Sequence, residues 1–172
     1  KKKQINRRVA TITEIDGVKK YSILTLEELR AYPHIVLLGE PGIGKSTALD
    51  YMAKISGANV IKVRTFMHGM FPDQEFPLFL DALDEFRSDG STIDKTYELA
   101  RLIKERKYSQ WRLTCRAEDW RNTADTSPFI EMGISENVLV VQLLPINHEE
   151  ACLILESRGE ISPDEFLEQA RN

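Results

Sequence analysis

The chain has 172 residues, which is enough for one domain with a substantial core and too short for two. Apolar residues make up 42% of it and charged residues 29%, as is usual for soluble globular proteins. The net charge of −4 argues against a general nucleic-acid binder, and the apolar runs are far shorter than the ~20 residues that span a bilayer.

Residues 1–32 are predicted to form an N-terminal arm. The arm starts with a basic run that includes Arg7 and Arg8. Such charge blocks are commonly solvated, and contact with nucleic acid is the alternative interpretation. Residues 22–30 are expected to form a short helix, in which Thr25 and Glu28 have the spacing of a capping box.

From residue 33 onward, short apolar runs alternate with helical stretches, as is typical of an α/β fold with a mainly parallel sheet. Strands are predicted at residues 35–38, 59–66, 77–81, 111–115 and 138–144. Helices are predicted at residues 44–56, 93–107, 148–157 and 163–171.

The chain has two cysteines, Cys115 and Cys152, each in an apolar or structured stretch. Two buried thiols in a reducing compartment fit this pattern better than a disulfide scaffold. The sequence therefore predicts a cytoplasmic protein with no place in a membrane.

The clearest motif is the stretch GEPGIGKST, which fits the pattern G-x-x-x-x-G-K-[ST]. Glycines let the main chain turn sharply and aim several N–H groups inward, and the helix that follows adds the positive end of its dipole. An apolar strand before the motif and an amphipathic helix after it are the context that a phosphate loop requires. We expect Lys45 to reach the β- and γ-phosphates of a nucleotide and Ser46 to bind Mg²⁺. The predicted nucleotide-binding residues are Gly39, Glu40, Pro41, Gly42, Ile43, Gly44, Lys45, Ser46 and Thr47.

A second motif, PLFLDALDEF, places an acidic segment directly after a continuous apolar strand. A carboxylate at the C-terminal edge of a parallel sheet lies where open α/β folds bind ligands. Asp81 is therefore expected to hold Mg²⁺ opposite Ser46, and Asp84 or Glu85 to orient the attacking water as general base. Glu85 is the preferred base. The alternative is that Asp84 and Glu85 only stabilise the N-terminus of a helix.

Together, GEPGIGKST, FLDALDE and the later stretch WRLTCR resemble STAND-class P-loop NTPases of the NACHT type. In that family a small residue follows the Mg²⁺ aspartate, and acidic residues lie three and four positions after it, as in Asp81-Ala82-Leu83-Asp84-Glu85. Common AAA+ proteins place a glutamate directly after the aspartate. LTCRAEDWR and LLPINHEEA are also similar to segments of bacterial STAND proteins, which include antiviral-defence ATPases.

The resemblance implies an ASCE- or AAA-like P-loop NTPase fold, with a parallel sheet in the order 5-1-4-3-2 and helices on both faces. It implies ATP or ADP with Mg²⁺ as ligands, and no guanine-reading Asn-Lys-x-Asp stretch occurs. It also implies that Arg116 senses the γ-phosphate; an ion pair with Glu118 or Asp119 is the alternative. Residues 33–146 would form the core, and 147–172 the truncated start of a helical lid. The connection between residues 66 and 76 is shorter than expected in this family.

The resulting interpretation is a Mg-dependent ATPase domain that works as a nucleotide-controlled signalling switch, with a role in bacterial defence implied by the resemblance. The expected partners are further copies or further domains of a longer chain, and nucleic acid is not expected. One alternative is a AAA+-type motor or loader. Another is a nucleotide-binding scaffold that hydrolyses little, and phosphate release would distinguish it from an enzyme.

Overall fold

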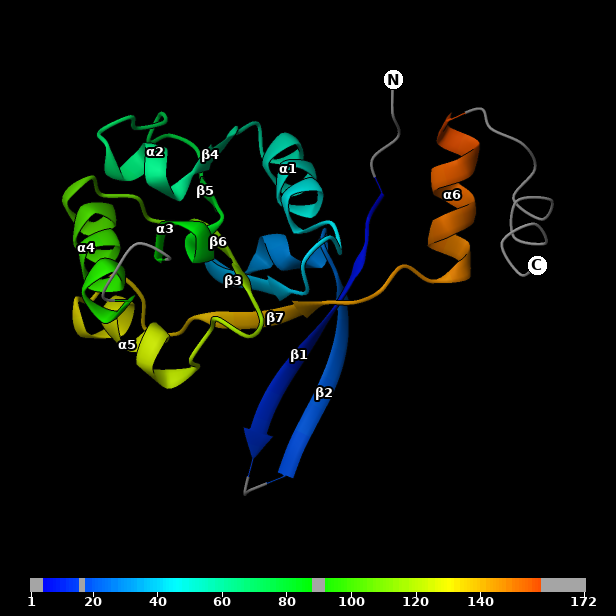
Figure 1. Ribbon diagram of the computed structural model, residues 1–172, viewed down its shortest axis with the longest axis horizontal. Coiled ribbons are helices and arrows are strands. Elements are labelled where there is room, and N and C mark those ends of the chain that lie inside the picture. The colour runs from blue at the N-terminus through cyan, green and yellow to red at the C-terminus, as the bar shows by residue number, and fades with distance from the viewer. Residues whose placement is uncertain (1–4, 16–17, 88–91, 159–172) are drawn as a thin grey trace.

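A sheet of seven strands forms the middle layer of the structure (Figure 1). The structure is a computed structural model, and it describes residues 5–15, 18–87 and 92–158. The strands lie in the order β2-β1-β7-β3-β6-β5-β4. Their bounds are β1 Arg8–Ile15, β2 Val18–Thr25, β3 His34–Gly39, β4 Val60–Lys62, β5 Leu78–Asp81, β6 Trp111–Arg116 and β7 Leu139–Leu143. The helices are the 3₁₀ helix η1 Glu28–Ala31 and the α-helices α1 Lys45–Ile55, α2 Val63–Met67, α3 Leu83–Arg87, α4 Thr92–Glu105, α5 Thr123–Glu131 and α6 His148–Arg158.

The sheet is mixed. Strands β7, β3, β6, β5 and β4 pair with one another in parallel, whereas β1 and β2 form an antiparallel hairpin that joins the sheet through antiparallel pairing with β7. Strands β1 and β2 extend away from the helices (Figure 1). The prediction of a parallel sheet in the order 5-1-4-3-2 is therefore wrong for the sheet as a whole, because it left out the two antiparallel strands; the five parallel strands taken alone have that order.

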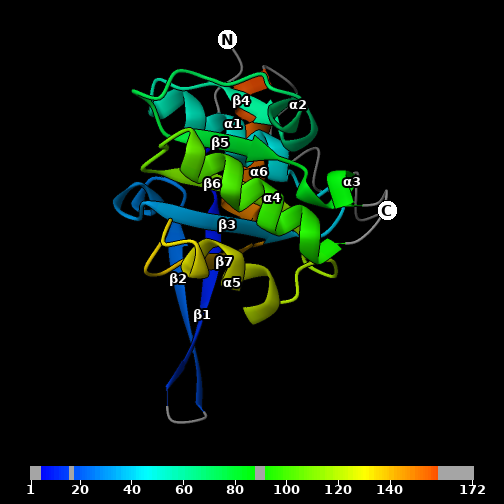
Figure 2. The same ribbon diagram turned by 90° about the vertical axis from the view of Figure 1, so that its left-hand side faces the viewer.

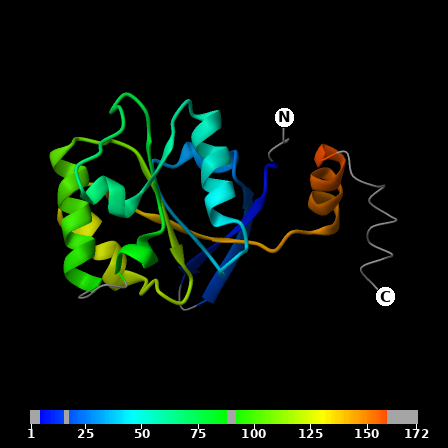
Figure 3. The same cartoon turned by 45° about the horizontal axis from the view of Figure 1, so that its top comes forward.

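Helices cover both faces of the parallel strands. Side chains alternate between the two faces along each strand, so a strand can contribute to two buried cores. On β3, Val36 and Leu38 belong to one buried core, which also contains residues of α2, α4 and α5. Ile35 and Leu37 belong to the second core, which contains residues of α1 and η1. Figure 2 shows α4 and α5 in front of the strands, and Figure 3 shows α1, in cyan, on the side of the sheet opposite the green α4.

Two predicted elements need correction. The strand expected at residues 59–66 ends at Lys62, because α2 begins at Val63. The helix expected at residues 22–30 is wrong in its first half, which belongs to β2. The capping box itself is present, with Glu28 Oε2 2.7 Å from the main-chain nitrogen of Thr25. Helix α5 was not predicted, and the helix expected at residues 163–171 lies outside the described residues.

The interpretation of Arg7 and Arg8 as part of a solvated arm is wrong. Arg7 is 7% exposed, and Arg8 starts β1 and forms an ion pair with Glu150 of α6. Arg7 and Arg8 are thus packed against the rest of the domain.

The two cysteines differ in environment. Cys115 on β6 is buried, and burial raises the pKa of its thiol to about 12. Cys152 on α6 is half-buried, so the expectation that both thiols are buried is wrong. Among the residues that the structure describes, no helix is both long and apolar enough to cross a membrane.

Candidate functional site

The predicted site residues lie at one edge of the sheet, where the parallel strands end. Because parallel strands point the same way, their carboxyl ends share an edge. Gly39 at the end of β3 is in register with Arg116 at the end of β6. One strand further along, Asp81 at the end of β5 is in register with Lys62 at the end of β4. The edge therefore carries a glycine-rich loop, a carboxylate and two cations in neighbouring strands.

The loop between β3 and α1 has the main-chain conformation that its glycines allow. Gly42 and Gly44 have φ angles of 77° and 97°, in the left-handed region that favours glycine. Gly44 is the residue directly before α1, so the loop opens onto the N-terminus of that helix. An anion there meets main-chain N–H groups and the positive end of the helix dipole.

Lys45 reaches back across this loop. Its Nζ donates hydrogen bonds to the carbonyl oxygens of Gly39 at 2.7 Å and Glu40 at 2.9 Å. A Cβ atom at Gly39 would lie 2.8 Å from Ile43 Cγ2, so the start of the loop has no room for a side chain. The Lys45 ammonium group therefore lies against the main chain at the start of this loop.

Asp81 is a buried carboxylate of the site, with an exposed fraction of 3%. Its Oδ2 lies 2.7 Å from Lys62 Nζ, and its Oδ1 accepts a 2.6 Å hydrogen bond from the Thr114 hydroxyl. Burial would raise the pKa of Asp81, but hydrogen bonds from Lys62, Thr114 and Ser46 outweigh it and lower the pKa below its usual value. Ser46, in the first turn of α1, lines the same cavity as Asp81.

The chain turns sharply directly after Asp81. Ala82 has a φ of 65°, which is unusual for a residue with a side chain, and its N–H donates a 2.8 Å hydrogen bond to the Thr114 hydroxyl. The turn leads into α3, which carries Asp84 and Glu85 in its first turn. The two carboxylates are therefore brought over the same sheet edge as Asp81.

Asp84 and Arg116, both predicted to be catalytic, contact each other. Arg116 Nε lies 3.0 Å from Asp84 Oδ2, and the Arg116 main-chain N–H donates a 3.2 Å hydrogen bond to Asp84 Oδ1. The alternative prediction, an ion pair between Arg116 and Glu118 or Asp119, is wrong, because Arg116 pairs with Asp84. Asp84 is mostly buried, whereas Glu85 is exposed.

Two adjoining cavities meet at these residues. The smaller, of about 280 Å³, lies between the phosphate loop and the acidic segment. The larger, of about 610 Å³, lies beyond the acidic segment, where Lys62, Arg64 and Arg87 face it. Asp84, Glu85 and Arg116 line both. The residues that line the smaller cavity are Pro41, Gly42, Gly44, Lys45, Ser46, Thr47, Asp81, Ala82, Asp84, Glu85, Thr114 and Arg116.

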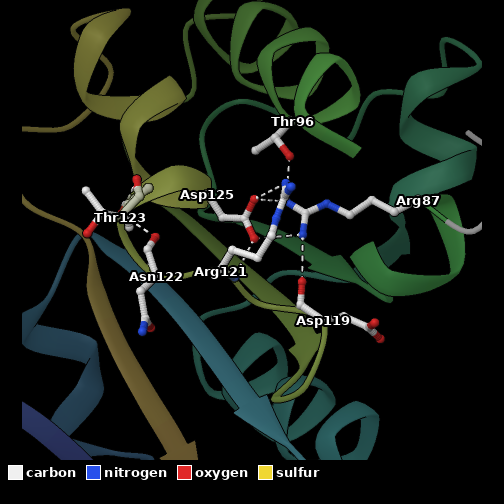
Figure 4. Close-up of polar contacts among 8 residues, drawn as sticks. Arg87, Thr96, Asp119, Arg121, Asn122, Thr123 and Asp125 are labelled. Carbon is white, nitrogen blue, oxygen red and sulfur yellow. Dashed lines mark hydrogen bonds and ion pairs between the residues drawn. The ribbon is translucent and has the colours of Figure 1, made fainter. Parts of the chain in front are cut away.

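A buried ion-pair network holds α3 in place (Figure 4). Arg87, at the end of α3, is 4% exposed and donates to Asp125 Oδ2 at 3.0 Å, to the Thr96 hydroxyl at 2.5 Å and to the Asp119 carbonyl at 3.2 Å. Arg121 approaches the same Asp125 carboxylate, with Nη2 2.8 Å from Oδ1. Figure 4 shows both guanidinium groups directed at Asp125. The network connects the helix that carries Asp84 and Glu85 to α4, α5 and the segment after β6.

The structure thus brings together most of the predicted residues and adds others. Gly39, Glu40 and Ile43 support the loop without lining the smaller cavity, and the remaining predicted residues line it. Sequence reasoning missed Lys62, Thr114 and Arg87. Thr114 could have been noticed as a polar residue inside an otherwise apolar strand, and Lys62 as a cation near a predicted strand end.

Comparisons with known proteins give distant likenesses. No protein-family model matches the chain, and no curated protein matches it. AMPPCP-bound DnaA from Aquifex aeolicus is similar in structure, with a TM-score of 0.47 and 16% identity over 77% of this chain and 47% of that chain. A DNA replication initiation factor gives a TM-score of 0.48 and 17% identity over 77% of this chain and 46% of that one. The cytoplasmic domain of EssC gives 0.37 and 15% over 85% and 38%. The chain spans less than half the length of each of these structures.

Proposed function

We propose that this chain is a P-loop NTPase domain that binds Mg·ATP and hydrolyses it. The observation that carries the proposal is the pairing of two elements at one sheet edge. A left-handed glycine turn opens onto the N-terminus of α1, and the buried carboxylate of Asp81 lines the same cavity as Ser46 in the first turn of that helix. A triphosphate on the loop would place its metal ion between these two side chains.

The donor groups suit Mg²⁺, which prefers hard oxygen ligands. The Ser46 hydroxyl and the Asp81 carboxylate would hold the ion, and Thr114 keeps Asp81 oriented through a 2.6 Å hydrogen bond. When bound, the metal would neutralise part of the charge on the β- and γ-phosphates.

Hydrolysis requires a water molecule that attacks the γ-phosphorus while the bond to the β–γ bridging oxygen breaks and ADP leaves. Glu85 is exposed at the rim of both cavities and is the proposed base that takes the proton of this water. Asp84 is engaged by Arg116, so we assign it the role of holding that guanidinium group. Lys45 and Arg116 would stabilise the charge of the transferred group.

A nucleotide-controlled switch of the STAND or NACHT type, with a role in bacterial defence, is the finer form of this proposal. Its support is the acidic segment, in which Ala82 follows Asp81 and the carboxylates come three and four positions later. A AAA+-type motor or loader remains the alternative. Formation of a ring with ATP would favour the AAA+ alternative, because such enzymes take an arginine from a neighbouring copy.

The test uses titration calorimetry with Mg·AMPPCP together with phosphate release from Mg·ATP. We expect binding of the analogue and a slow, Mg-dependent release of phosphate. Binding without phosphate release would replace the enzyme by a nucleotide-binding scaffold. Absence of binding at millimolar analogue would overturn the proposal as a whole.

A further inference from the structure

Arg7 bridges two segments that are far apart in the sequence. Its Nη1 donates a 2.5 Å hydrogen bond to the carbonyl oxygen of Ile43 in the phosphate loop. Its Nη2 donates to the carbonyl oxygen of Leu144, directly after β7. In Figures 1 and 3 the chain segment that leads into β1 passes between α1 and α6. One guanidinium group thus contacts both the phosphate loop and the connection that leads to α6.

The contact with Ile43 bears directly on the phosphate loop. A peptide group is planar and trans, so the carbonyl of Ile43 and the N–H of Gly44 point in opposite directions. A guanidinium group that holds this carbonyl therefore also fixes the direction of the Gly44 N–H. Gly44 lines the smaller cavity, and a Cβ atom there would lie 2.9 Å from Arg7 Nη1.

The contact with Leu144 belongs to a set of bonds that reaches α6. The Leu144 N–H donates to the carbonyl of Arg8 at 3.1 Å. The N–H of Arg8 donates in turn to Glu150 Oε1 at 3.2 Å, and Glu150 forms reciprocal hydrogen bonds with Asn147 at the start of α6, at 2.9 and 2.8 Å. Residues 7 and 8 therefore connect the end of β7 with the first turn of the last described helix.

Burial of the Arg7 guanidinium group carries a desolvation cost, because a charged group loses its contacts with water. Arg7 is 7% exposed, and its Nε is buried without a hydrogen-bond partner among the described residues. Burial lowers the pKa of Arg7, against the opposing effect of the nearby Glu150. A methionine or leucine would fill similar space without the desolvation cost, but neither could hold two carbonyl groups.

We propose that Arg7 is a positioning residue that couples the state of the phosphate loop to the β7–α6 connection. The inference rests on the proposed nucleotide site. A phosphate group that binds the Gly44 N–H strengthens the orientation that Arg7 already favours. The same guanidinium group then holds Leu144 more firmly, and the segment at residues 144–152 becomes more ordered when nucleotide binds.

The experiment is hydrogen–deuterium exchange of the full chain, followed by mass spectrometry, with and without saturating Mg·AMPPCP. In the wild type, nucleotide should slow exchange both in residues 39–47 and in residues 144–152. In Arg7→Met, the first response should remain and the second should disappear. Arg30→Met, a change of an exposed arginine in η1, should keep both responses.

The outcomes separate this inference from the proposed function. If residues 39–47 do not respond in the wild type, the nucleotide site itself fails. If they respond while residues 144–152 do not, or if Arg7→Met keeps both responses, the coupling is overturned. If Arg7→Met does not fold, as judged by circular dichroism, Arg7→Lys is the test. A lysine keeps the charge but lacks the planar fork that reaches two carbonyls, so it should lose more than about half of the second response; an undiminished response would also overturn the coupling.

Discussion

Lys62 Nζ lies 2.7 Å from Asp81 Oδ2, so the carboxylate proposed to bind the metal is already paired with a cation of the neighbouring strand. The register of β4 and β5 places these two residues opposite each other at the sheet edge. The hydrogen bond to Asp81 raises the pKa of Lys62, so the amine stays charged at neutral pH. Lys62 therefore compensates the charge of Asp81, and it would compete with a divalent ion for the Asp81 carboxylate.

This pairing predicts that Lys62→Met increases the apparent affinity for Mg²⁺. The concentration of Mg²⁺ that gives half-maximal AMPPCP binding should fall by about threefold, in keeping with the modest strength of a half-exposed ion pair. A Mg²⁺ titration at fixed analogue concentration measures the change. Lys54→Met, at an exposed lysine paired with Asp50, is the matched control and should leave the midpoint unchanged. Weaker analogue binding in Lys62→Met would instead mean that Lys62 contacts the nucleotide.

Lys45 is predicted to be required for nucleotide binding. Its ammonium group donates hydrogen bonds to the carbonyls of Gly39 and Glu40 at the start of the loop. From there it can reorient toward a bound phosphate. Lys45→Ala should abolish binding of Mg·AMPPCP in calorimetry, while Lys54→Ala should bind as the wild type does. Micromolar affinity retained by Lys45→Ala would contradict the assignment of the phosphate loop.

Glu85→Gln tests the proposed base. The change removes the proton acceptor but keeps the size of the side chain, so nucleotide binding should persist while phosphate release slows by about a hundredfold. Glu75→Gln, at an exposed glutamate after α2, should retain the wild-type rate. An unchanged rate in Glu85→Gln would move the role of the base to Asp84.

Arg116 and Asp84 are predicted to act as a unit. Arg116→Ala should weaken ATP binding about tenfold more than ADP binding, because the guanidinium group is expected to meet the γ-phosphate. Asp84→Asn should show part of the same defect, since Asp84 holds both the side chain and the main-chain N–H of Arg116. The double variant should lose little beyond Arg116→Ala in equilibrium binding measurements. Equal losses for ATP and ADP would reduce Arg116 to a structural residue.

The structural elements around the candidate site were predicted correctly where local sequence patterns determine them. The apolar strand at residues 35–38, the glycine-rich stretch and the helix after it follow one another directly, and each has its own pattern. The position of Asp81 at a strand end was predicted for the same reason, because a continuous apolar run precedes it. Local patterns also gave the parallel strands, whose order in space came from the family resemblance.

The parts that were missed depend on contacts between distant segments. Lys62 lies beside Asp81 because β4 ends there. The strand was predicted to continue to Phe66, so Lys62 was not recognised as a residue at a strand end. Arg7 matters because two carbonyls 36 and 137 residues away accept its hydrogen bonds. The β1–β2 hairpin left a local signal that was overlooked: Asp16-Gly17, a dipeptide typical of hairpin turns, stands between two alternating stretches.

Asp125 gives the clearest prediction for pH-dependent stability. It is fully buried and pairs with Arg87 and Arg121. Burial would raise the pKa of Asp125, but the hydrogen bonds from Arg121 and Arg87 lower it below its usual value. A carboxylate with a lowered pKa in the folded state stabilises the protein above its unfolded pKa of about 3.9, and this contribution is lost as the pH falls through the folded value.

Asp125→Asn should therefore cost about 3 kcal/mol in free energy of unfolding at pH 7, because the buried guanidinium group of Arg87 loses its counter-charge and the exposed Arg121 loses its ion pair. The difference from the wild type should shrink as the pH falls below about 4, where the unfolded carboxylate takes up a proton. Urea unfolding followed by tryptophan fluorescence at several pH values measures both effects. Glu105→Gln, at an exposed pair with Arg101, should change stability by less than about 0.5 kcal/mol at every pH. A difference for Asp125→Asn that stayed constant down to the acid transition would show that the Asp125 charge does not stabilise the fold. In that case the network around Arg87 would hold α3 through its hydrogen bonds to Thr96 and Asp119 instead.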